Sequence, residues 1–305
     1  MSVDALAADF EQHRPHLLSV AYRITGSVVD AEDAVQDAWL RLDRHGAEGI
    51  DDLRAWLTTV VGRICVDRLR SAVVRRESYV GQWLPEPIVT PLSGSRPADP
   101  LDEVVRDEDN RLAALVVLDT LNAEQRVAFV LHDGFGLPFA EVADVLAVSP
   151  AAARQAASRA RKIVASAPPQ ADDEEHNAAV QRLLAALASG DVDAVVQSLH
   201  PDGRFIGDAG GTSKTAPNVI AGPDRTARFM LGLAGMYGPE RLLAVEPVLV
   251  NGRLGMLHPG APVDPASGKP AIARRVIAWT VQDGAVWAGY DMVNPAKLHG
   301  VRVTA

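Results

Sequence analysis

Residues 137–164, LPFAEVADVLAVSPAAARQAASRARKIV, decide the fold of the first half of the chain. Their apolar positions recur at helical spacing and predict two helices, 138–146 and 150–164, joined by three residues. Ser149 is a residue type that caps helix N-termini, and Pro150 suits the first helical position. A short helix, a tight turn and a longer helix form the length pattern of a helix-turn-helix.

The second of these helices has two different faces. Alanines at 153, 160 and either 156 or 157 fall on one side, where small residues let two helices cross closely. The other side carries donors suited to base edges and phosphates: Arg154, Gln155, Ser158, Arg159 and Lys162. A basic face can also be merely solvated. The preceding turn and the lack of acidic residues in 150–165 favour DNA binding.

A second basic helix is predicted at 52–76. Residues 54–76 contain six arginines and one acidic residue, Asp67. Arginines near a tryptophan suit a nucleic-acid backbone with unstacked bases. The candidate contacts are Trp56, Arg63, Arg68, Arg70 and Arg75. The alternative is a surface helix whose arginines extend along the protein into solvent.

The segment 30–52 carries the opposite charge, with eight acidic residues against two arginines. Its apolar residues recur at helical spacing until Gly46, so a helix is predicted there. The helix is too acidic for DNA, and it therefore serves a protein partner or solubility. The net charge of −9 argues mildly against nucleic-acid binding. However, the local charge sets the potential at a phosphate, and this charge is sorted into acidic and basic segments.

The composition is that of a globular protein. A length of 305 residues predicts two or three domains. With 48% hydrophobic and 23% charged residues, the composition excludes disorder as the dominant state. No apolar run approaches the ~18 residues of a membrane span, and residues 1–9 lack signal-peptide features. The single cysteine, Cys65, excludes a disulfide framework and a cysteine-based zinc site within one chain. We expect a cytoplasmic protein with no metal, cofactor or membrane partner.

Two breaks divide the sequence into blocks. Residues 82–100 contain five prolines, which exclude a continuous helix, and a polar hinge follows residue 166. The expected domains are 1–80, a Pro-rich linker at 81–100, 101–166, a hinge at 167–174, and 175–305. The first two domains are predicted to be all-α, with further helices at 4–25, 102–121 and 123–133.

The third block has a different pattern. Two helices are predicted at about 175–188 and 191–199, followed by short runs rich in Val, Ile, Leu and Trp. The dipeptide Asp283-Gly284 separates two such runs and is typical of a two-residue β-hairpin loop. Helices followed by an antiparallel meander predict an α+β domain.

Three segments, in this order, resemble those of bacterial extracytoplasmic-function (ECF) sigma factors. Residues 30–42, DAEDAVQDAWLRL, resemble the helix that binds core RNA polymerase. Residues 55–70, AWLTTVVGRICVDRLR, resemble the helix that melts promoters and contacts the −10 element. The segment 141–161 is similar to the helix-turn-helix that contacts the −35 element.

The resemblance covers about residues 1–166 and implies core RNA polymerase and promoter DNA as partners. It assigns the polymerase contact to Asp33, Gln36, Asp37 and Leu40. It assigns the −10 element to the candidate contacts of the helix at 52–76, which are Trp56, Arg63, Arg68, Arg70 and Arg75. It assigns the −35 element to Arg154, Gln155, Ser158, Arg159 and Lys162. A sigma factor performs no chemistry, so the chain is not expected to be an enzyme.

Three further segments resemble a subgroup of this family that carries a C-terminal SnoaL-like domain. Residues 79–87, YVGQWLPEP, resemble its linker motif. Residues 294–298, NPAKL, resemble its Asn-Pro-Asp-Lys-Leu motif with Ala296 in place of the acid. Residues 208–214, DAGGTSK, resemble its Asp-Gly-Gly-Gly-Lys loop, with Ala209 and two extra residues before the lysine. The resemblance implies a curved-sheet α+β cone at 175–305 with regulatory contacts at Trp83, Pro85, Asp208, Lys214, Asn294, Pro295 and Lys297.

The linker motif has physical properties of its own. Trp83 provides a large rigid anchor, while Pro85 and Pro87 hold the segment extended. Such a segment is expected to dock rather than to fold by itself. The alternative is an inert spacer that contains a tryptophan.

Two other functions remain open for 175–305. The domain could sense a small apolar molecule and change the activity of the sigma factor, or it could catalyse a cyclase-like or isomerase-like reaction. Its candidate acids and bases form no spacing motif: His200, Asp202, Asp208, His258, Asp291 and His299. A resemblance of fold does not carry function by itself.

Overall fold

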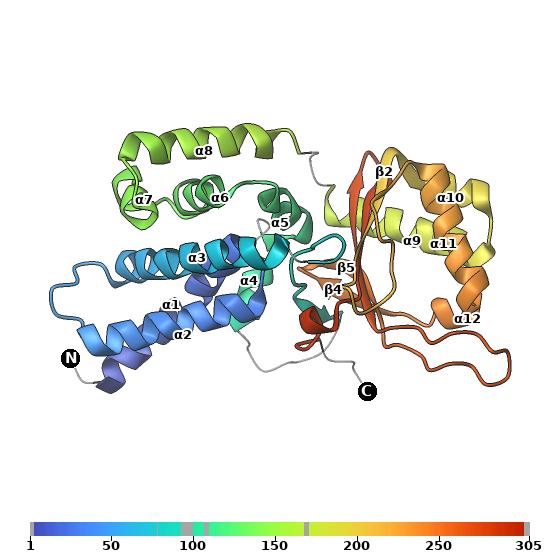
Figure 1. The fold of residues 1–305 in the computed structure, drawn as a ribbon, viewed down its shortest axis with the longest axis horizontal. Coiled ribbons are helices and arrows are strands. Elements are labelled where there is room, and N and C mark those ends of the chain that lie inside the picture. The colour runs from blue at the N-terminus through green and yellow to red at the C-terminus, as the bar shows by residue number, and fades with distance from the viewer. Residues whose placement is uncertain (1–2, 78, 93–99, 107–109, 168–170, 302–305) are drawn as a thin grey trace. The chain divides into compact units, whose positions relative to one another are not determined.

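The computed structural model describes residues 3–77, 79–92, 100–106, 110–167 and 171–301. The chain forms two compact units (Figure 1). The first unit comprises Met1–Ser78 and Ser95–Ala167, and the second comprises Tyr79–Gly94 and Pro168–Ala305. In the described part of the chain, no helix combines the length and the apolar character needed to cross a membrane.

The first unit begins with three long helices, α1 (Val3–Thr25), α2 (Val28–His45) and α3 (Leu53–Glu77). Gly26, with φ of 69°, permits the tight turn between α1 and α2. Ser27 caps α2 by accepting a hydrogen bond from the Asp30 amide at 3.2 Å. The sequence left open whether Pro15 kinks one helix or separates two, and the structure has a single helix through Pro15.

Shorter helices complete the first unit. They are α4 (Pro100–Arg106), α5 (Leu112–Asp119), α6 (Ala123–Phe129), the π-helical turn η2 (Val130–Gly134), α7 (Phe139–Leu146) and α8 (Pro150–Ala165). The helix expected at 102–121 is interrupted. The buried Asn110 amide donates to the Val104 carbonyl at 2.7 Å and to Ser19 at 2.9 Å, and it accepts from Arg23 at 3.1 Å. A buried amide needs such partners, and here they come from α4 and α1 rather than from one continuous helix.

The two helical blocks pack together instead of forming separate bodies. At Gly62 of α3, a Cβ atom would lie 3.2 Å from Leu131 and 3.3 Å from Val145 of α7, so the helices approach closely there. Arg126 of α6 is buried and donates to the Arg23 carbonyl of α1 at 3.0 Å. Residues predicted to belong to two domains therefore share one core.

The second unit is built of helices and one sheet. Its elements are α9 (Asp173–Ser189), α10 (Val192–Ser198), β2 (Leu199–Asp208), β3 (Ile220–Ala221), α11 (Pro223–Tyr237), α12 (Pro239–Leu242), β4 (Glu246–Val250), β5 (Arg253–His258), β6 (Arg275–Gln282), β7 (Ala285–Met292) and the 3₁₀ turn η3 (Pro295–Lys297). With β1 (Val89–Pro91) included, the strand order is β1-β4-β5-β6-β7-β2-β3, and β2 and β7 are parallel while the other pairs are antiparallel. The α+β prediction is confirmed.

The predicted hairpin between β6 and β7 is also present. Asp283 and Gly284 have φ angles of 50° and 70°, and they connect the paired residues Gln282 and Ala285. Two consecutive positive φ angles are what a type I′ hairpin turn requires, and Asp-Gly supplies them at low cost.

The linker contributes a strand of its own, β1 (Val89–Pro91), to this sheet. Val89 lies opposite Val250 of β4, and the amide of Asn251 donates to the Ile88 carbonyl at 2.8 Å. Pro91 is tolerated because β1 is an edge strand. The linker therefore docks, as expected, and also extends the sheet.

Helices α9, α10 and α11 lie beside the sheet (Figure 1). They share its apolar core, which includes Val180, Leu183, Phe205, Met230 and Trp279. The sheet face is thus buried by helices, as the layered architecture of α+β domains requires.

Candidate nucleic-acid and partner-binding surfaces

Helix α8 is positioned by its N-terminal cap and by three buried alanines. The Ser149 side chain accepts from the Ala152 amide at 3.2 Å, and Pro150 occupies the first turn. Ala147 ends α7 in a left-handed conformation, which makes the predicted turn between the helices. The face with Ala153, Ala157 and Ala160 is fully buried against α6 and α7.

The five polar residues predicted to bind DNA lie together on the opposite side of α8, and all five are exposed. At 3.6 residues per turn they span an arc of about 140°. Arg154 lies over the Phe139 ring at 5.2 Å. Within the described residues, Gln155, Arg159 and Lys162 make no side-chain hydrogen bond or ion pair. Their donors are therefore available to a ligand.

The residues predicted to contact the −10 element do not share one face of α3. Trp56, Arg63 and Arg70 fall within about 40° of one another, whereas Arg68 lies about 120° from Trp56. Trp56 is half-buried, with its ring 5.4 Å from that of His45, and Arg63 and Arg70 are exposed. The side chain of Arg75 lies outside the described residues.

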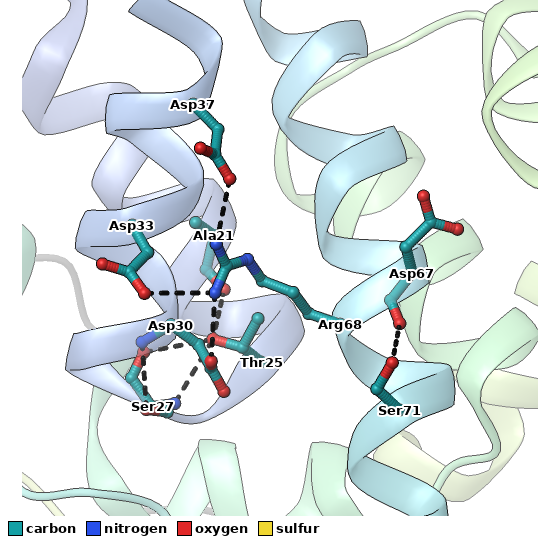
Figure 2. A network of polar contacts seen from close by, with 9 residues as sticks. All are labelled: Ala21, Thr25, Ser27, Asp30, Asp33, Asp37, Asp67, Arg68 and Ser71. Atoms are coloured by element: carbon teal, nitrogen blue, oxygen red, sulfur yellow. Dashed lines mark hydrogen bonds and ion pairs between the residues drawn. The ribbon is translucent and has the colours of Figure 1, made fainter.

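Arg68 instead reaches from α3 to the acidic helix α2 (Figure 2). Its guanidinium pairs with Asp37 at 3.0 Å and with Asp30 and Asp33 at 3.3 Å each. Burial opposes the charge of Arg68, but the hydrogen bond to Asp37 and the charges of the other two carboxylates raise its pKa. One predicted DNA contact thus neutralises part of the predicted polymerase-binding surface.

The residues predicted to bind polymerase do lie on one face of α2. Asp33, Gln36, Asp37 and Leu40 span an arc of about 100°. The Leu40 side chain is 47% exposed although it is apolar. Asp33 and Gln36 also line a polar hollow of about 510 Å³ between α1 and α2, together with Trp39 and residues of α1. The face combines acidic groups with an exposed apolar side chain.

In the second unit, three of the regulatory residues predicted from the sequence, Trp83, Asn294 and Lys297, lie around the carboxylate of a fourth, Asp208. Asp208 is fully buried at the end of β2. It accepts hydrogen bonds from the Leu84 amide at 2.8 Å, from the Lys297 ammonium at 2.6 Å and from the Tyr79 hydroxyl. A buried carboxylate is tolerated when its charge is paired and its lone pairs are occupied, and these three donors do both.

The ends of the linker and of the chain meet around this carboxylate. The Asn294 amide donates to the Tyr79 hydroxyl at 2.8 Å. The Lys297 ammonium lies 4.0 Å from the centroid of the Trp83 ring, in cation–π geometry, and donates to the Leu84 carbonyl. We call the group Tyr79, Trp83, Leu84, Asp208, Asn294 and Lys297 the linker clasp.

Three other predicted regulatory residues have different places. Pro85 is buried beside the clasp, and Pro295 is exposed at the start of η3. Lys214 is exposed and belongs to none of the contacts of the clasp. The lysine that pairs with Asp208 is Lys297, and not Lys214 of the loop that follows Asp208. At Gly210, a Cβ atom would lie 2.5 Å from the Asn294 side chain, so this position of the loop requires glycine.

Sequence reasoning missed Tyr79 and the Leu84 amide as clasp members. Tyr79 begins the segment that resembles the linker motif, so its position was available as a signal. The backbone amide of Leu84 carries no side-chain signal. Its role depends only on where the docked linker places it.

Two of the candidate acids and bases of the second unit, His258 and Asp291, have structural partners. The His258 Nε2 atom is bonded to the Arg241 carbonyl at 2.8 Å. Asp291 is buried and bonded to Thr215 at 2.5 Å and to Arg275 at 3.2 Å. Within the described residues, no group of three or more His, Cys, Asp or Glu could hold a metal ion.

The clasp predicts different effects for two lysines. Lys297→Met leaves the buried Asp208 without its counter-ion, so the free energy of unfolding of the second unit should fall by about 3–5 kcal/mol. Lys214→Met, at an exposed site, should change it by less than about 0.5 kcal/mol. Denaturant unfolding of both variants provides the measurement. Equal effects of the two substitutions would contradict the clasp.

Comparisons with known proteins identify the families to which the helical blocks and the α+β domain are similar. The family model for sigma-70 region 2 matches residues 10–74, that for sigma-70 region 4 matches 111–164, and that for the SnoaL-like domain matches 180–289. The ECF RNA polymerase sigma factor SigJ of Mycobacterium tuberculosis is 54% identical over 297 residues, covering 96% of this chain and 93% of that protein. The probable ECF sigma factor SigI of the same species is 32% identical over 304 residues, covering 98% and 97%.

The crystal structure of Mycobacterium tuberculosis SigJ superposes with a TM-score of 0.83 at 51% identity, covering 98% of this chain and 100% of that one. The relatives therefore match both helical blocks and the α+β domain over nearly their full lengths. This chain belongs to the ECF sigma factors of RNA polymerase that carry a C-terminal SnoaL-like domain.

Proposed function

We propose that this sigma factor binds promoters and core RNA polymerase through three separate faces, and that its second unit modulates activity through the linker. The α8 face contacts the −35 element, the Trp56–Arg63–Arg70 face of α3 contacts the −10 element, and the Asp33–Leu40 face of α2 binds core polymerase. The observation that carries the proposal is the α8 face, where five exposed donors stand on a helix without an acidic residue.

Geometry supports the role of α8. A helix that follows a tight turn and packs on a second helix can enter the major groove with its exposed side. Arginine and glutamine donate to base edges there, while lysine contacts phosphates. The stacking of Arg154 on Phe139 restrains its guanidinium, which reduces the entropy lost on binding.

Arg159 and Lys162 should respond differently to substitution. Arg159→Ala should weaken −35 binding by about 1–3 kcal/mol and relax specificity at one base pair. Lys162→Ala should weaken binding to all sequences alike and lower the salt dependence. Fluorescence anisotropy with −35 duplexes, matched and mismatched at each position, measures both at fixed salt. If Arg159→Ala keeps the full preference for the matched duplex, α8 does not contact the bases as proposed.

The α2 face supports a protein partner. Acidic groups on it speed the approach of a basic surface, and an exposed leucine provides the apolar contact that stabilises the complex. Arg68 holds Asp33 and Asp37 in place and leaves Leu40 exposed at the end of the face. Leu40 has no part in the Arg68 pairs, which makes it the cleaner position for a test.

Leu40→Ser should weaken binding to core polymerase about tenfold, because the buried apolar contact is lost. Val263→Ser is the matched control, since Val263 is an apolar residue of the second unit that is 58% exposed. Anisotropy of labelled sigma factor titrated with core enzyme gives both affinities. Equal affinities of the two variants would remove α2 as the docking face.

The packing of the first unit supports a resting form that opens at the promoter. The −35 and −10 elements lie about 25 base pairs apart, which is about 85 Å of duplex. A compact unit of this size has a radius of gyration of about 15 Å. Both DNA faces cannot reach their elements while α3 packs on α7 at Gly62, so the two helical blocks must separate.

The linker determines how far they can separate. Helix α3 ends at Glu77 and α4 begins at Pro100, so 22 residues join the two blocks. Thirteen of these, 79–91, belong to the second unit and are held by the clasp and by β1. The docked linker therefore restricts the span available to the blocks, and this restriction is our proposed means of regulation.

Weakening the clasp should change transcription. Trp83→Ala and Lys297→Met should shift promoter-dependent transcription with purified core polymerase in the same direction, because both release the same contact. Deletion from Asn294 onwards should act like them, and Lys214→Met should transcribe like the parent chain. If all three clasp changes transcribe like the parent chain, the second unit does not act through the linker.

We also propose that the second unit acts by binding and not by catalysis, and that the protein works in the bacterial cytoplasm. His258 and Asp291 are held by neighbouring groups of the fold, as described above. The proposed functional domains are those expected from the sequence, although the two helical blocks pack as one compact unit and the linker is grouped from Tyr79 with the second unit.

A further inference from the structure

One stripe of side chains runs along α2 at spacings of three or four residues. It consists of Asp30, Asp33, Asp37 and Leu40, and the last three belong to the proposed polymerase-binding face. Carboxylates at this spacing on a helix repel each other. The stripe therefore needs a counter-charge before it can present ordered carboxylates to a partner.

Arg68 supplies this charge from the neighbouring helix α3 (Figure 2). Its Nη1 atom donates to Asp30 Oδ1 and Asp33 Oδ2 at 3.3 Å each, and its Nη2 atom donates to Asp37 Oδ2 at 3.0 Å. Asp30 is the innermost of the three carboxylates, with 26% of its side chain exposed, and its backbone amide is held by the Ser27 cap. Asp30 thus fixes the guanidinium, which also reaches the two outer carboxylates.

The two outer carboxylates remain accessible to a partner. The side chains of Asp33 and Asp37 are 54% and 49% exposed. Each uses Oδ2 for Arg68, and within the described residues its Oδ1 atom makes no hydrogen bond. Because the two oxygens of a carboxylate offer about four lone-pair sites, Arg68 and a cation of the partner can share it. A carboxylate that is already held in place loses less conformational entropy when the partner binds.

The same contacts withdraw Arg68 from DNA. Both of its terminal nitrogens are occupied, only 24% of its side chain is exposed, and it lies about 120° around α3 from Trp56. Arg63, on the proposed −10 face, is exposed and makes no side-chain contact of this kind within the described residues. Two arginines of one helix are thus in different states, one held by carboxylates and one available.

We propose that Arg68 is a positioning residue for polymerase binding and not a contact of the −10 element. It acts through Asp33 and Asp37, whose carboxylates it holds in the arrangement that a basic surface of the polymerase meets. The role of Arg68 rests on the proposed docking function of the α2 face. Its charge also reduces the attraction of that face for a basic partner, but water and salt screen this effect at exposed groups, so the gain in order prevails.

The first measurement is the anisotropy of the labelled full-length chain titrated with core polymerase. Arg68→Gln should weaken binding about tenfold. Arg68→Lys should recover part of this loss, because lysine keeps the charge but lacks the planar fork that joins several carboxylates. Arg161→Gln is the matched control, since Arg161 pairs with Asp133 at 2.5 Å in the same unit and belongs to none of the proposed faces. It should bind polymerase like the parent chain.

A double substitution separates positioning from a general contribution to folding. In a chain with Asp33→Asn and Asp37→Asn, Arg68→Gln should cause no further loss of polymerase affinity, because the groups through which it acts have lost their charge. In a chain with Leu40→Ser, Arg68→Gln should add its full loss. A residue that merely stabilised the fold would add the same loss in both backgrounds, and that result would overturn the proposal.

Binding to a single-stranded −10 oligonucleotide tests whether Arg68 contacts DNA. At physiological salt, Arg68→Gln should stay within about twofold of the parent chain, whereas Arg63→Gln should weaken binding about tenfold. Equal losses for these two variants would make Arg68 a DNA contact and overturn the proposal.

The Leu40→Ser variant distinguishes failure of the positioning role from failure of the docking face. If Leu40→Ser weakens polymerase binding but Arg68→Gln binds like Arg161→Gln, Arg68 positions nothing and the docking face stands. If neither Leu40→Ser nor Arg68→Gln weakens polymerase binding, the docking face is refuted and the role of Arg68 with it.

Discussion

The buried carboxylate of Asp208 is the constraint on which the second unit depends. An ion removed from water costs several kcal/mol unless it is paired and hydrogen-bonded. Its three donors come from two distant segments, because Tyr79 and Leu84 belong to the linker and Lys297 follows the last strand. The linker can leave its place only by exposing or unpairing this charge. A spacer between two DNA-binding blocks is thereby made part of another domain.

Charge is used in two ways in this protein. Buried arginines such as Arg126 and Arg275 hold helices and strands together through carboxylates and carbonyls. On α8, by contrast, Arg159 is exposed without an acidic residue on the same helix. Arg68 combines features of both groups: it lies on a basic helix, but its guanidinium forms ion pairs with three aspartates of α2. Whether an arginine has a structural partner or is available to a ligand therefore depends on the groups near it in three dimensions, and not on its neighbours in the sequence.

Several parts of the fold were predictable because they depend on neighbouring residues. Ser149 and Pro150 start α8 through a cap and a fixed φ angle, and Asp283-Gly284 forms the hairpin turn because those residues accept positive φ. The α8 face was also predictable, since a helix of known period sorts its own side chains. The interrupted helix near Asn110 was not, because the partners of that amide lie on α1 and α4.

The sequence by itself determined most of the order of the elements, the faces of α2 and α8, and four members of the clasp, Trp83, Asp208, Asn294 and Lys297, because each follows from local periodicity or a short motif. Only the tertiary structure decided that Lys297 and not Lys214 meets Asp208, that Arg68 joins α2, and that residues 89–91 extend the sheet. The reason is distance along the chain. Asp208 meets residues 124 positions before and 89 positions after it, and no local pattern specifies which of several charged groups will fill one buried site.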